Sequence, residues 1–529
     1  MSEARQSPNG GGIAGFAGSS PPSPQTSGFR LPPSAGARAG PAAAPATPPE
    51  PSETGFDAYL EAYGNREVTF QFRGLEFRFV LSQGLFSSAD IDRGTRLLLK
   101  VFSEVLDKDL AQGRPLPRRI VDCGCGVGVI GICAAHAVLA AAGNTDGGNT
   151  GGRSADAGIS GRAAEAGPLC LRAQDRDELA RIFTRGNALR NGLGFLQART
   201  EPLLAGDETW DLILSNLPAK AGEPVLDDFL SRSAGLLAPG GRAVIVVVNS
   251  LAGFVRTRLN KLLGERGVCL VREGTEHQVF VYEGVPPPVP AKPKAAAEAP
   301  DPPLLRTRPF YLRNRAPYDM EGIKYEIGAV YGAAEFDRPD GAVEIAAALL
   351  DRLGGRLFKG PPAPVLVHEG GQGHFPLWFL LFLERNGLAA PELLLLHGRN
   401  VLALEAARAN IAASPLTARP AVLGVPGVDL GLDAATLLSL SPARGFGFIA
   451  AFPRIVPQTD PYAGILEALD TLLVPGGAAL ISLPSSQADR LANRQAMIHQ
   501  AIRLDRRKPS GFTRVGDLKR RGFRALLYC

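Results

Sequence analysis

The stretch "VDCGCGVGVIG" has residue types and a spacing that could bind a cofactor. An apolar run ends at Asp122, and glycines then alternate with other residues before a second apolar segment. These alternating glycines are Gly124, Gly126 and Gly128. Glycines here allow a tight turn from a strand into a helix and a close approach of the backbone to a ligand. The segment from Gly126 also matches the dinucleotide pattern G-x-G-x-x-G, which alone has little specificity.

A second stretch, "DLILSNLPAK", ends an apolar run in Asn216 and carries Pro218 two positions later. Strands that simply turn usually end in Gly, Asn-Gly or Asp-Gly, so this ending suggests an amide held at the edge of a pocket. The Asn216 oxygen and the carbonyl of Leu217, aimed by the rigid proline, could accept two hydrogen bonds from a planar amine. Two such acceptors turn the nitrogen lone pair toward a methyl group, and catalysis then rests on orientation and electrostatics. The plainer alternative is a strand-terminating Asn followed by a loop proline.

Two features favour S-adenosylmethionine over a dinucleotide as the ligand of the glycine loop. The carboxylate of Asp122 suits an ammonium group and repels a pyrophosphate, and the Asn-x-Pro strand end suits methyl transfer. A second acid, Asp175, follows the apolar run "PLCLRAQ" and could bind both ribose hydroxyls, while Asp177 could cap the next helix. Glu201, after the following run, is a candidate for the adenine edge.

Short apolar runs alternate with segments of helical spacing around these residues, which predicts a parallel, doubly wound α/β sheet. The pattern occurs twice. "GLEFRFVLSQGLFSSADIDRGTRLLLKVF" from Gly74 matches "GIKYEIGAVYGAAEFDRPDGAVEIAAALL" from Gly322, and "LLAPGGRAVIVV" matches "LLVPGGAALISL". We therefore expect two tandem Rossmann-like domains, each ending in an antiparallel strand pair.

Composition sets the domain boundaries. Segments rich in Gly, Pro, Ala and Ser predict a disordered tail, a disordered insertion and an extended linker. The predicted boundaries are 1–53 for the tail, 54–284 for the first domain with its insertion at 143–167, 285–303 for the linker and 304–529 for the second domain.

Composition also excludes several classes of protein. The chain has 529 residues but no apolar run of membrane-spanning length and no signal-peptide pattern, so neither a membrane span nor secretion is expected. Six cysteines do not indicate a disulfide framework, and a reducing, cytoplasmic location is expected. Cys123 and Cys125 lack further ligands at metal-site spacing, so no metal is predicted.

The net charge is only +5, but residues 503–524 hold seven Arg and two Lys against two Asp, which suits a solvated face or a phosphate-binding patch.

Together these residues resemble the class I S-adenosylmethionine-dependent methyltransferases of the small-domain family, which includes the bacterial ribosomal RNA guanine-N2 methyltransferases. The resemblance rests on "LSQGLFSSADIDRGTRLLL", "VDCGCGVG", "LRAQD" and "SNLPAKAG", and covers roughly 66–284 and, more weakly, 306–529. The matching residues of the first of these stretches are Phe86, Asp92, Gly94 and Thr95.

The resemblance implies methyl transfer from S-adenosylmethionine to an exocyclic amine of a base in ribosomal RNA, with guanine N2 favoured. A single-stranded or flipped base is the expected substrate, because a base inside a duplex is out of reach. The family, however, reads Asn-Pro-Pro-aromatic, and its aromatic residue stacks on the target base, whereas this chain has Leu217 and Ala219. Phe86 is a candidate substrate contact, and Lys220 could meet a phosphate or lie in solvent.

Three other functions stay open. A protein glutamine amide is also planar, and the missing aromatic residue slightly favours it as the acceptor. A non-catalytic RNA-binding or assembly factor is disfavoured by the complete set of Asp122, the three glycines, Asp175 and Asn216. A dehydrogenase is least favoured, because nothing downstream supplies a hydride-transfer site.

The second copy is predicted to bind no cofactor and to do no chemistry. Aligned by sequence offset, three of its residues replace site residues of the first copy. These are Glu369 for Asp122, Phe375 for Gly128 and Ala451 for Asn216. Its second strand ends in "HGRN", without an acid for ribose. We expect it to pack on the first copy and to help hold substrate, with its basic end as a candidate RNA contact. The working copy thus comes first, whereas in the ribosomal RNA enzymes it is usually the later one.

Overall fold

The computed structural model describes most of both predicted domains. The described residues are 53–86, 88–144, 168–264, 268–284, 305, 308–335, 337–456, 461–504 and 513–529. The predicted tail up to residue 52, the linker, and the insertion from residue 145 onward lie outside them. Gly143 and Asn144, predicted in the insertion, instead end helix α3 (Val129–Asn144). The described residues of both copies belong to one compact unit.

The first copy is built on a seven-stranded sheet with the order β5-β4-β3-β6-β7-β9-β8. Strands β5 to β7 are parallel to one another, and β9 runs antiparallel to both of its neighbours. The predicted doubly wound sheet with a closing antiparallel pair is confirmed. The strands are β3 (Arg119–Cys123), β4 (Cys170–Asp175), β5 (Gln197–Thr200), β6 (Trp210–Asn216), β7 (Leu237–Val248), β8 (Val268–Glu273) and β9 (His277–Glu283).

The second copy repeats this topology in the order β14-β13-β12-β15-β16-β18-β17, which confirms the tandem architecture. Here β18 is the antiparallel strand between its neighbours. The strands are β12 (Val365–His368), β13 (Leu393–Gly398), β14 (Ala421–Pro426), β15 (Phe446–Ala451), β16 (Leu473–Pro484), β17 (Arg514–Arg520) and β18 (Phe523–Tyr528).

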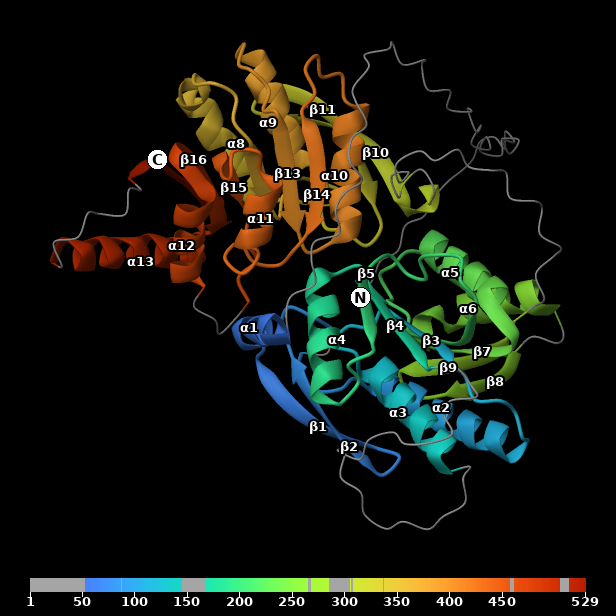
Figure 1. Ribbon diagram of the computed structural model, residues 1–529. Coiled ribbons are helices and arrows are strands. Elements are labelled where there is room, and N and C mark those ends of the chain that lie inside the picture. The colour runs from blue at the N-terminus through green and yellow to red at the C-terminus, as the bar shows by residue number, and fades with distance from the viewer. Residues whose placement is uncertain are drawn as a thin grey trace, which may run out of the picture. The chain divides into compact units, whose positions relative to one another are not determined.

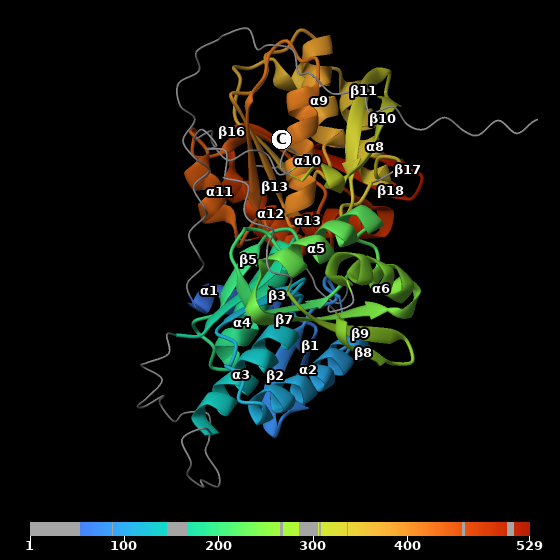
Figure 2. The same cartoon turned by 90° about the vertical axis from the view of Figure 1, so that its right-hand side faces the viewer.

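Helices cover both faces of each sheet (Figures 1 and 2), because the strands present apolar side chains on both faces. In the first copy one core holds α2 (Arg93–Ala111), α3 and α4 (Glu178–Arg190), and the opposite core holds α5 (Glu223–Leu236) and α6 (Asn249–Leu263). In the second copy one core holds α8 (Gly341–Leu353), α9 (His374–Arg385) and α10 (Val401–Ala413), and the other holds α11 (Ala434–Leu440), α12 (Tyr462–Leu472) and α13 (Ser485–Leu504).

An antiparallel hairpin precedes each sheet, a feature that the sequence analysis did not foresee. The paired strands are β1 (Arg66–Phe72) with β2 (Leu75–Leu81), and β10 (Leu312–Met320) with β11 (Ile323–Val330). Both turns have two residues with positive φ, a geometry that matches the twist of the strands. Helix α1 (Glu53–Tyr63) precedes the first hairpin and the short helix η2 (Pro309–Tyr311) precedes the second; η3 (Arg356–Phe358) follows α8.

Candidate active site

Three candidate side chains lie at the ends of neighbouring strands of the first sheet. Asp122 is in β3, Asp175 is the last residue of β4, and Asn216 is the last residue of β6. Strand β3 lies between the other two. The carboxyl ends of parallel strands meet at one edge of the sheet, which is where open α/β sheets bind their ligands. The structure therefore brings together the residues that the sequence singled out.

The glycine loop that follows β3 runs beside Asn216 and leaves open space on one side. Its three glycines have φ values of 76°, 57° and 89°, in the left-handed region that side chains rarely adopt. A methyl group placed on Gly124 would lie 3.8 Å from the carbonyl oxygen of Asn216. A methyl group on Gly126 would meet no described atom within 4 Å apart from its chain neighbours. A ligand can thus approach the backbone at Gly126 next to the strand end that carries Asn216.

Asp175 connects its strand end to the glycine loop. Its Oδ2 accepts a hydrogen bond from the Gly126 N–H at 3.1 Å, and its Oδ1 accepts one from the Asp177 N–H at 3.0 Å. Burial raises the pKa of Asp175, and the nearby Asp177 carboxylate raises it further. Asp177 accepts a hydrogen bond from the Leu179 N–H at 3.0 Å, which confirms the predicted cap of α4. Ribose binding by Asp175 stays a prediction.

Asp122 lies beneath the loop, with no exposed surface. Its Oδ2 accepts a hydrogen bond from the N–H of Gly131 in α3 at 2.8 Å, whereas its buried Oδ1 has no hydrogen-bond partner among the described residues. Burial raises the pKa of this carboxyl group to about 7, although the Gly131 hydrogen bond opposes the rise. Asp122 therefore fixes the start of α3 behind the glycine loop, and direct contact with a ligand stays a prediction.

Asn216 is oriented by the N-terminus of α2. Its Nδ2 lies 3.3 Å from both carboxylate oxygens of Asp92 and 3.4 Å from Oγ1 of Thr95. Asp92 is the N-cap of α2 and accepts from the Gly94 N–H at 2.8 Å and the Thr95 N–H at 3.1 Å. A carboxylate can only accept hydrogen bonds, so the amide turns its nitrogen to Asp92 and leaves its oxygen free to accept. The sequence offered Asp92 and Thr95 only through the resemblance to a family.

The turn after Asn216 places the remaining residues of this stretch. The carbonyl of Pro218 accepts a hydrogen bond from the Ala221 N–H at 3.0 Å. Lys220 lies exposed in this turn, and Phe86, in the segment between β2 and α2, is 73% exposed. Both side chains are free to meet a substrate, which remains a prediction.

Glu201 stands just after β5, and its carboxylate is engaged by a side chain that the sequence analysis missed. Its Oε2 accepts a hydrogen bond from Nε2 of Gln174 at 2.8 Å. Gln174 is fully buried in β4, directly before Asp175. A polar residue inside an otherwise apolar strand was the signal that could have revealed it. Adenine recognition by Glu201 stays a prediction.

The second copy keeps the shape of the glycine loop, and this shape corrects the sequence alignment by two residues. Positive φ occurs at Glu369 (54°), Gly371 (61°) and Gly373 (109°), the same spacing as in the first copy. The N–H of Glu369 also bonds to the neighbouring strand as that of Gly124 does. Glu369 therefore replaces Gly124 rather than Asp122, and Gly373 rather than Phe375 stands at the position of Gly128. The constant sequence offset had suggested the wrong equivalence.

Strand pairing corrects the third equivalence in the same way. Ala451 occupies the position of Ser215, because each pairs with the last residue of the central strand. Phe452, rather than Ala451, therefore stands where Asn216 stands. A phenyl ring offers no amide oxygen to an amine, so the conclusion that this copy lacks the Asn is unchanged.

Two carboxylates occupy the space beside the loop of the second copy. Oε1 of Glu369 accepts a hydrogen bond from the Arg399 N–H at 2.6 Å, and Oε2 of Glu335 accepts one from the Gln372 N–H at 3.3 Å. A methyl group on Gly371 would collide with the Glu335 carboxylate, whereas the equivalent space at Gly126 is open. Burial raises the pKa of Glu335 to about 7. This filling supports the prediction that the second copy binds no cofactor.

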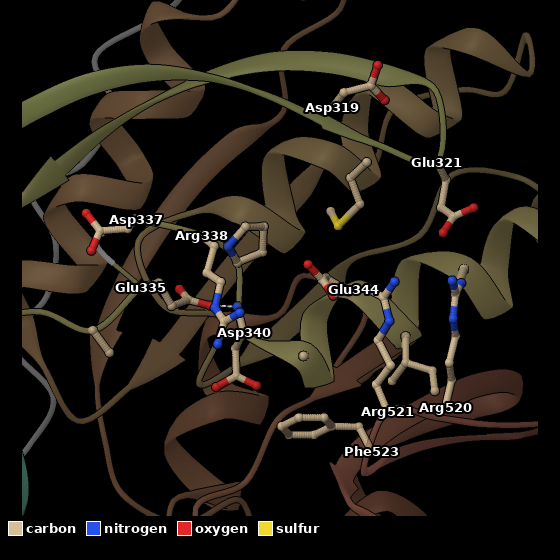
Figure 3. Close-up of a pocket in the computed structure, with 16 residues that line it drawn as sticks. Asp319, Glu321, Glu335, Asp337, Arg338, Asp340, Glu344, Arg520, Arg521 and Phe523 are labelled. Carbon is tan, nitrogen blue, oxygen red and sulfur yellow. Dashed lines mark hydrogen bonds and ion pairs between the residues drawn. The ribbon is translucent and has the colours of Figure 1, made fainter. Parts of the chain in front are cut away.

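A cavity of about 720 Å³ in the second copy contains none of the predicted site residues (Figure 3). Arg520 and Arg521, from the turn between β17 and β18, line it together with Phe523 and with Arg338. Acidic residues outnumber these bases and are Asp319, Glu321, Glu335, Asp337, Asp340 and Glu344. An excess of negative charge does not suit an RNA phosphate.

The predicted basic RNA contact near the end of the chain is largely neutralised where it is described. Lys519 and Arg524 pair with Asp489 at 3.1 and 2.5 Å, and Arg514 pairs with Asp517 at 3.4 Å. Arg524 also pairs with Asp517. Residues 505–512 of this basic run lie outside the described residues.

Two further predictions concern metals and membranes. Within the described ranges, no group of three or more His, Cys, Asp or Glu side chains is placed to hold a metal ion. No helix in the described part of the chain has the length and apolarity needed to cross a membrane.

Comparisons with known proteins agree with this geometry. Residues 76–144 match the family model described as the methyltransferase small domain. The uncharacterized protein YbxB of Bacillus subtilis is 25% identical over 210 residues, which are 39% of this chain and 86% of that protein. The structure of the T. thermophilus 16S rRNA N2 G1207 methyltransferase (RsmC), in complex with AdoMet and guanosine, is 17% identical. It matches 88% of this chain and 98% of its own, with a TM-score of 0.50.

The strand order, the glycine loop and the match of residues 76–144 to the family model together define a class I methyltransferase fold. Because the match to the T. thermophilus structure extends over 88% of this chain, it includes both copies of the fold. The protein is therefore a tandem methyltransferase-fold chain whose first copy carries the candidate active site.

Proposed function

We propose that the first copy transfers a methyl group from S-adenosylmethionine to an exocyclic amine of a base in ribosomal RNA, with guanine N2 favoured. The observation that carries this proposal is the orientation of Asn216. Its amide nitrogen is bound by Asp92, and its oxygen is left to accept from an amine. When bound, the cofactor supplies an electrophilic methyl group on a sulfonium centre.

Different residues of the first copy bind the cofactor and orient the substrate amine. Asp175 accepts from the ribose hydroxyls, and the backbone at Gly126 lies against the ligand. The Asn216 oxygen and the Leu217 carbonyl accept the two amine hydrogens and aim the nitrogen lone pair. No strong base is needed, because the amine proton leaves to solvent after transfer. Pro218 holds the Leu217 carbonyl in place.

RNA as the substrate is supported by two observations. The T. thermophilus enzyme of the same fold is a 16S rRNA methyltransferase. On this chain Phe86 offers an exposed ring for base stacking, and Lys220 an exposed charge for a phosphate. The alternative acceptor is a protein glutamine amide, and it is favoured by Ala219, which is exposed where the resembling family has its stacking aromatic residue.

The test is methyl transfer from labelled S-adenosylmethionine to total RNA and to total protein, offered separately, with Asn216→Ala as the control. Label in RNA that disappears in the variant supports the proposal and allows the nucleotide to be mapped. Label only in protein moves the acceptor to an amide. No label in either fraction, despite measurable cofactor binding, overturns methylation of both acceptors.

A further inference from the structure

Three loops at the candidate site are held by side chains of the second copy. We propose that Arg399, in the copy that lacks a cofactor site, is a positioning residue for the cofactor site of the first copy. Arg308 supports the neighbouring loop in the same way. This inference rests on the function proposed above, because it names a residue that acts on that site.

The Arg399 guanidinium binds Asp177 through two parallel hydrogen bonds. Its Nε donates to Oδ1 at 3.0 Å, and its Nη2 donates to Oδ2 at 2.7 Å. Nη2 also donates to the carbonyl oxygen of Gly84 at 2.9 Å. The Arg399 side chain is only 11% exposed, and a buried two-point pair of this kind fixes geometry as well as charge. Arg399 therefore joins the α4 cap to the segment that leads to Phe86.

This contact is one step away from the residue predicted to bind ribose. The Asp177 N–H donates to Oδ1 of Asp175, so the residue that Arg399 holds is itself bound to Asp175. The backbones are joined as well, because the Glu178 N–H donates to the Arg399 carbonyl at 2.8 Å. A reciprocal bond runs from the Val401 N–H to the Arg176 carbonyl at 3.0 Å, where the corresponding turns of the two copies meet.

Arg308 supports the loop between β5 and β6. It is 9% exposed and donates to the carbonyl oxygens of Leu203 and Leu204 at 3.0 and 3.1 Å. Leu204 has a φ of 48°, a strained value for a leucine. A methyl group on Gly124 would lie 3.7 Å from the Leu203 side chain. Arg308 thus holds a strained loop that packs directly beside the glycine loop.

The loop that follows Asn216 also packs on the second copy. Any side chain at Gly222 would collide with the ring of Tyr331, and Leu217 shares an apolar core with residues of the second copy. The β4–α4, β5–β6 and β6–α5 loops therefore each contact that copy. Loss of the two parallel hydrogen bonds from Arg399 to Asp177 should let Asp177 and Asp175 move. Cofactor affinity should then fall, while turnover at saturating cofactor stays close to normal.

The experiment measures cofactor dissociation by calorimetry, and cofactor KM and kcat by methyl transfer, on the full chain. Arg399→Ala should raise Kd and KM about tenfold or more with kcat little changed, and Arg308→Ala should show the same split. Arg399→Lys keeps the charge but cannot form the two parallel hydrogen bonds, so its cofactor affinity should lie between those of Arg399→Ala and the unaltered protein. Tyr63→Phe is the matched control, because it removes another bond between the copies, from Tyr63 to Asp429 at 2.6 Å, and leaves the hydrogen bonds between Arg399 and Asp177 in place.

The outcomes separate this inference from the function on which it rests. Absence of cofactor binding in the unaltered protein overturns the proposed function itself. If the unaltered protein binds cofactor and the Kd of Arg399→Ala is within about twofold of its value, the role of Arg399 alone is overturned. An equal loss in Tyr63→Phe shows a general effect of the interface and also overturns it. If Arg399→Ala does not fold, Arg399→Lys decides by the same comparison of KM with kcat.

Discussion

The amide nitrogen of Asn216 lies 3.3 Å from both carboxylate oxygens of Asp92, a residue 124 positions earlier in the chain. The same carboxylate caps α2, so its position is fixed by the helix. The orientation of the Asn216 amide is therefore set before any substrate arrives. Preorganised acceptors of this kind contribute to catalysis without reorganising during the reaction.

Replacing Asn216 by Ala should abolish the acceptor without disturbing the cofactor loop. We expect methyl transfer to fall by about 10²-fold or more, with cofactor affinity little changed, because the lost hydrogen bond forms with the substrate amine. Single-turnover transfer and calorimetric cofactor binding measure the two effects. Transfer that persists near the normal rate would rule out Asn216 as the orienting group.

Replacing Asp92 by Asn should separate its two roles, which are to cap helix α2 and to orient the Asn216 amide. Asn is as good an N-cap as Asp, so the free energy of unfolding should change by less than about 1 kcal/mol. The new side chain can donate as well as accept, so the Asn216 amide loses its fixed orientation and turnover should fall. Thermal unfolding and transfer assays measure these two results.

The second copy provides a matched control for this change. Asp340 is the N-cap of α8 and accepts from the Ala342 N–H at 2.8 Å, as Asp92 does in the first copy. Asp340→Asn should alter stability by a similar small amount and leave methyl transfer unchanged. Equal losses of activity in the two variants would show that Asp92 acts only through helix stability.

The buried carboxyl group of Asp122 should make stability depend on pH. Its pKa is raised to about 7, so the folded state holds a proton that the unfolded state releases near pH 4. Stability from this group is thus fully present at low pH and is lost as pH rises from about 4 to 7, by roughly 4 kcal/mol at most. Asp122→Asn should flatten this slope and be more stable than the unaltered protein at pH 8.

Urea unfolding between pH 4 and 8 measures this slope. Glu335→Gln is the matched variant, because the pKa of Glu335 is also raised to about 7 but its carboxyl group lies in the second copy. It should flatten the slope similarly and leave cofactor binding intact. An unchanged slope in Asp122→Asn would mean that this carboxyl group is ionised in the folded protein at neutral pH.

The strand ends of the candidate site could be predicted from sequence, because residues at the carboxyl ends of parallel strands must meet at one edge. Asp175 and Asn216 needed no more than the alternation of strands and helices. The equivalences within the second copy were harder. Glu369 resembles Asp122 in charge but matches Gly124 in backbone conformation, and only φ and strand register separate these possibilities.

Contacts between the copies could not be predicted in this way. Arg399 directly follows strand β13, and Arg308 directly precedes the short helix η2. The local sequence around each arginine predicts only where a strand ends or a helix begins. Their partners stand more than a hundred positions earlier in the chain, and no periodicity links residues so far apart. Asp92 escaped a residue-level prediction for the same reason, since a cap pattern does not reveal which distant amide the cap will bind.

One cofactor should bind per chain, and it should depend on Asp175. Strand β13 ends at Gly398 where β4 ends at Asp175, and Glu335 and Glu369 fill the loop of the second copy. Calorimetric titration should give a stoichiometry of one in the unaltered protein and no measurable binding in Asp175→Ala. A stoichiometry of two that falls to one in the variant would assign a cofactor site to the second copy. If the unaltered protein binds one cofactor, tight binding in the variant would rule out the role of Asp175.

The exposed ring of Phe86 offers a test of RNA as the acceptor. Base stacking on an aromatic side chain contributes about 1–3 kcal/mol, so Phe86→Ala should raise the KM for RNA by roughly tenfold or more. Cofactor affinity and stability should stay close to normal, because the ring is 73% exposed and packs little. Steady-state transfer to RNA at saturating cofactor measures this effect.

Phe195 supplies the control for this prediction. It is a second exposed phenylalanine of the first copy, 41% exposed, and it lies just before β5, at the opposite edge of the sheet from Asn216. Phe195→Ala should leave the KM for RNA unchanged. If Phe86→Ala behaves like Phe195→Ala, the ring does not stack on a base. The absence of an aromatic residue at Ala219 then weighs in favour of a glutamine amide as the acceptor.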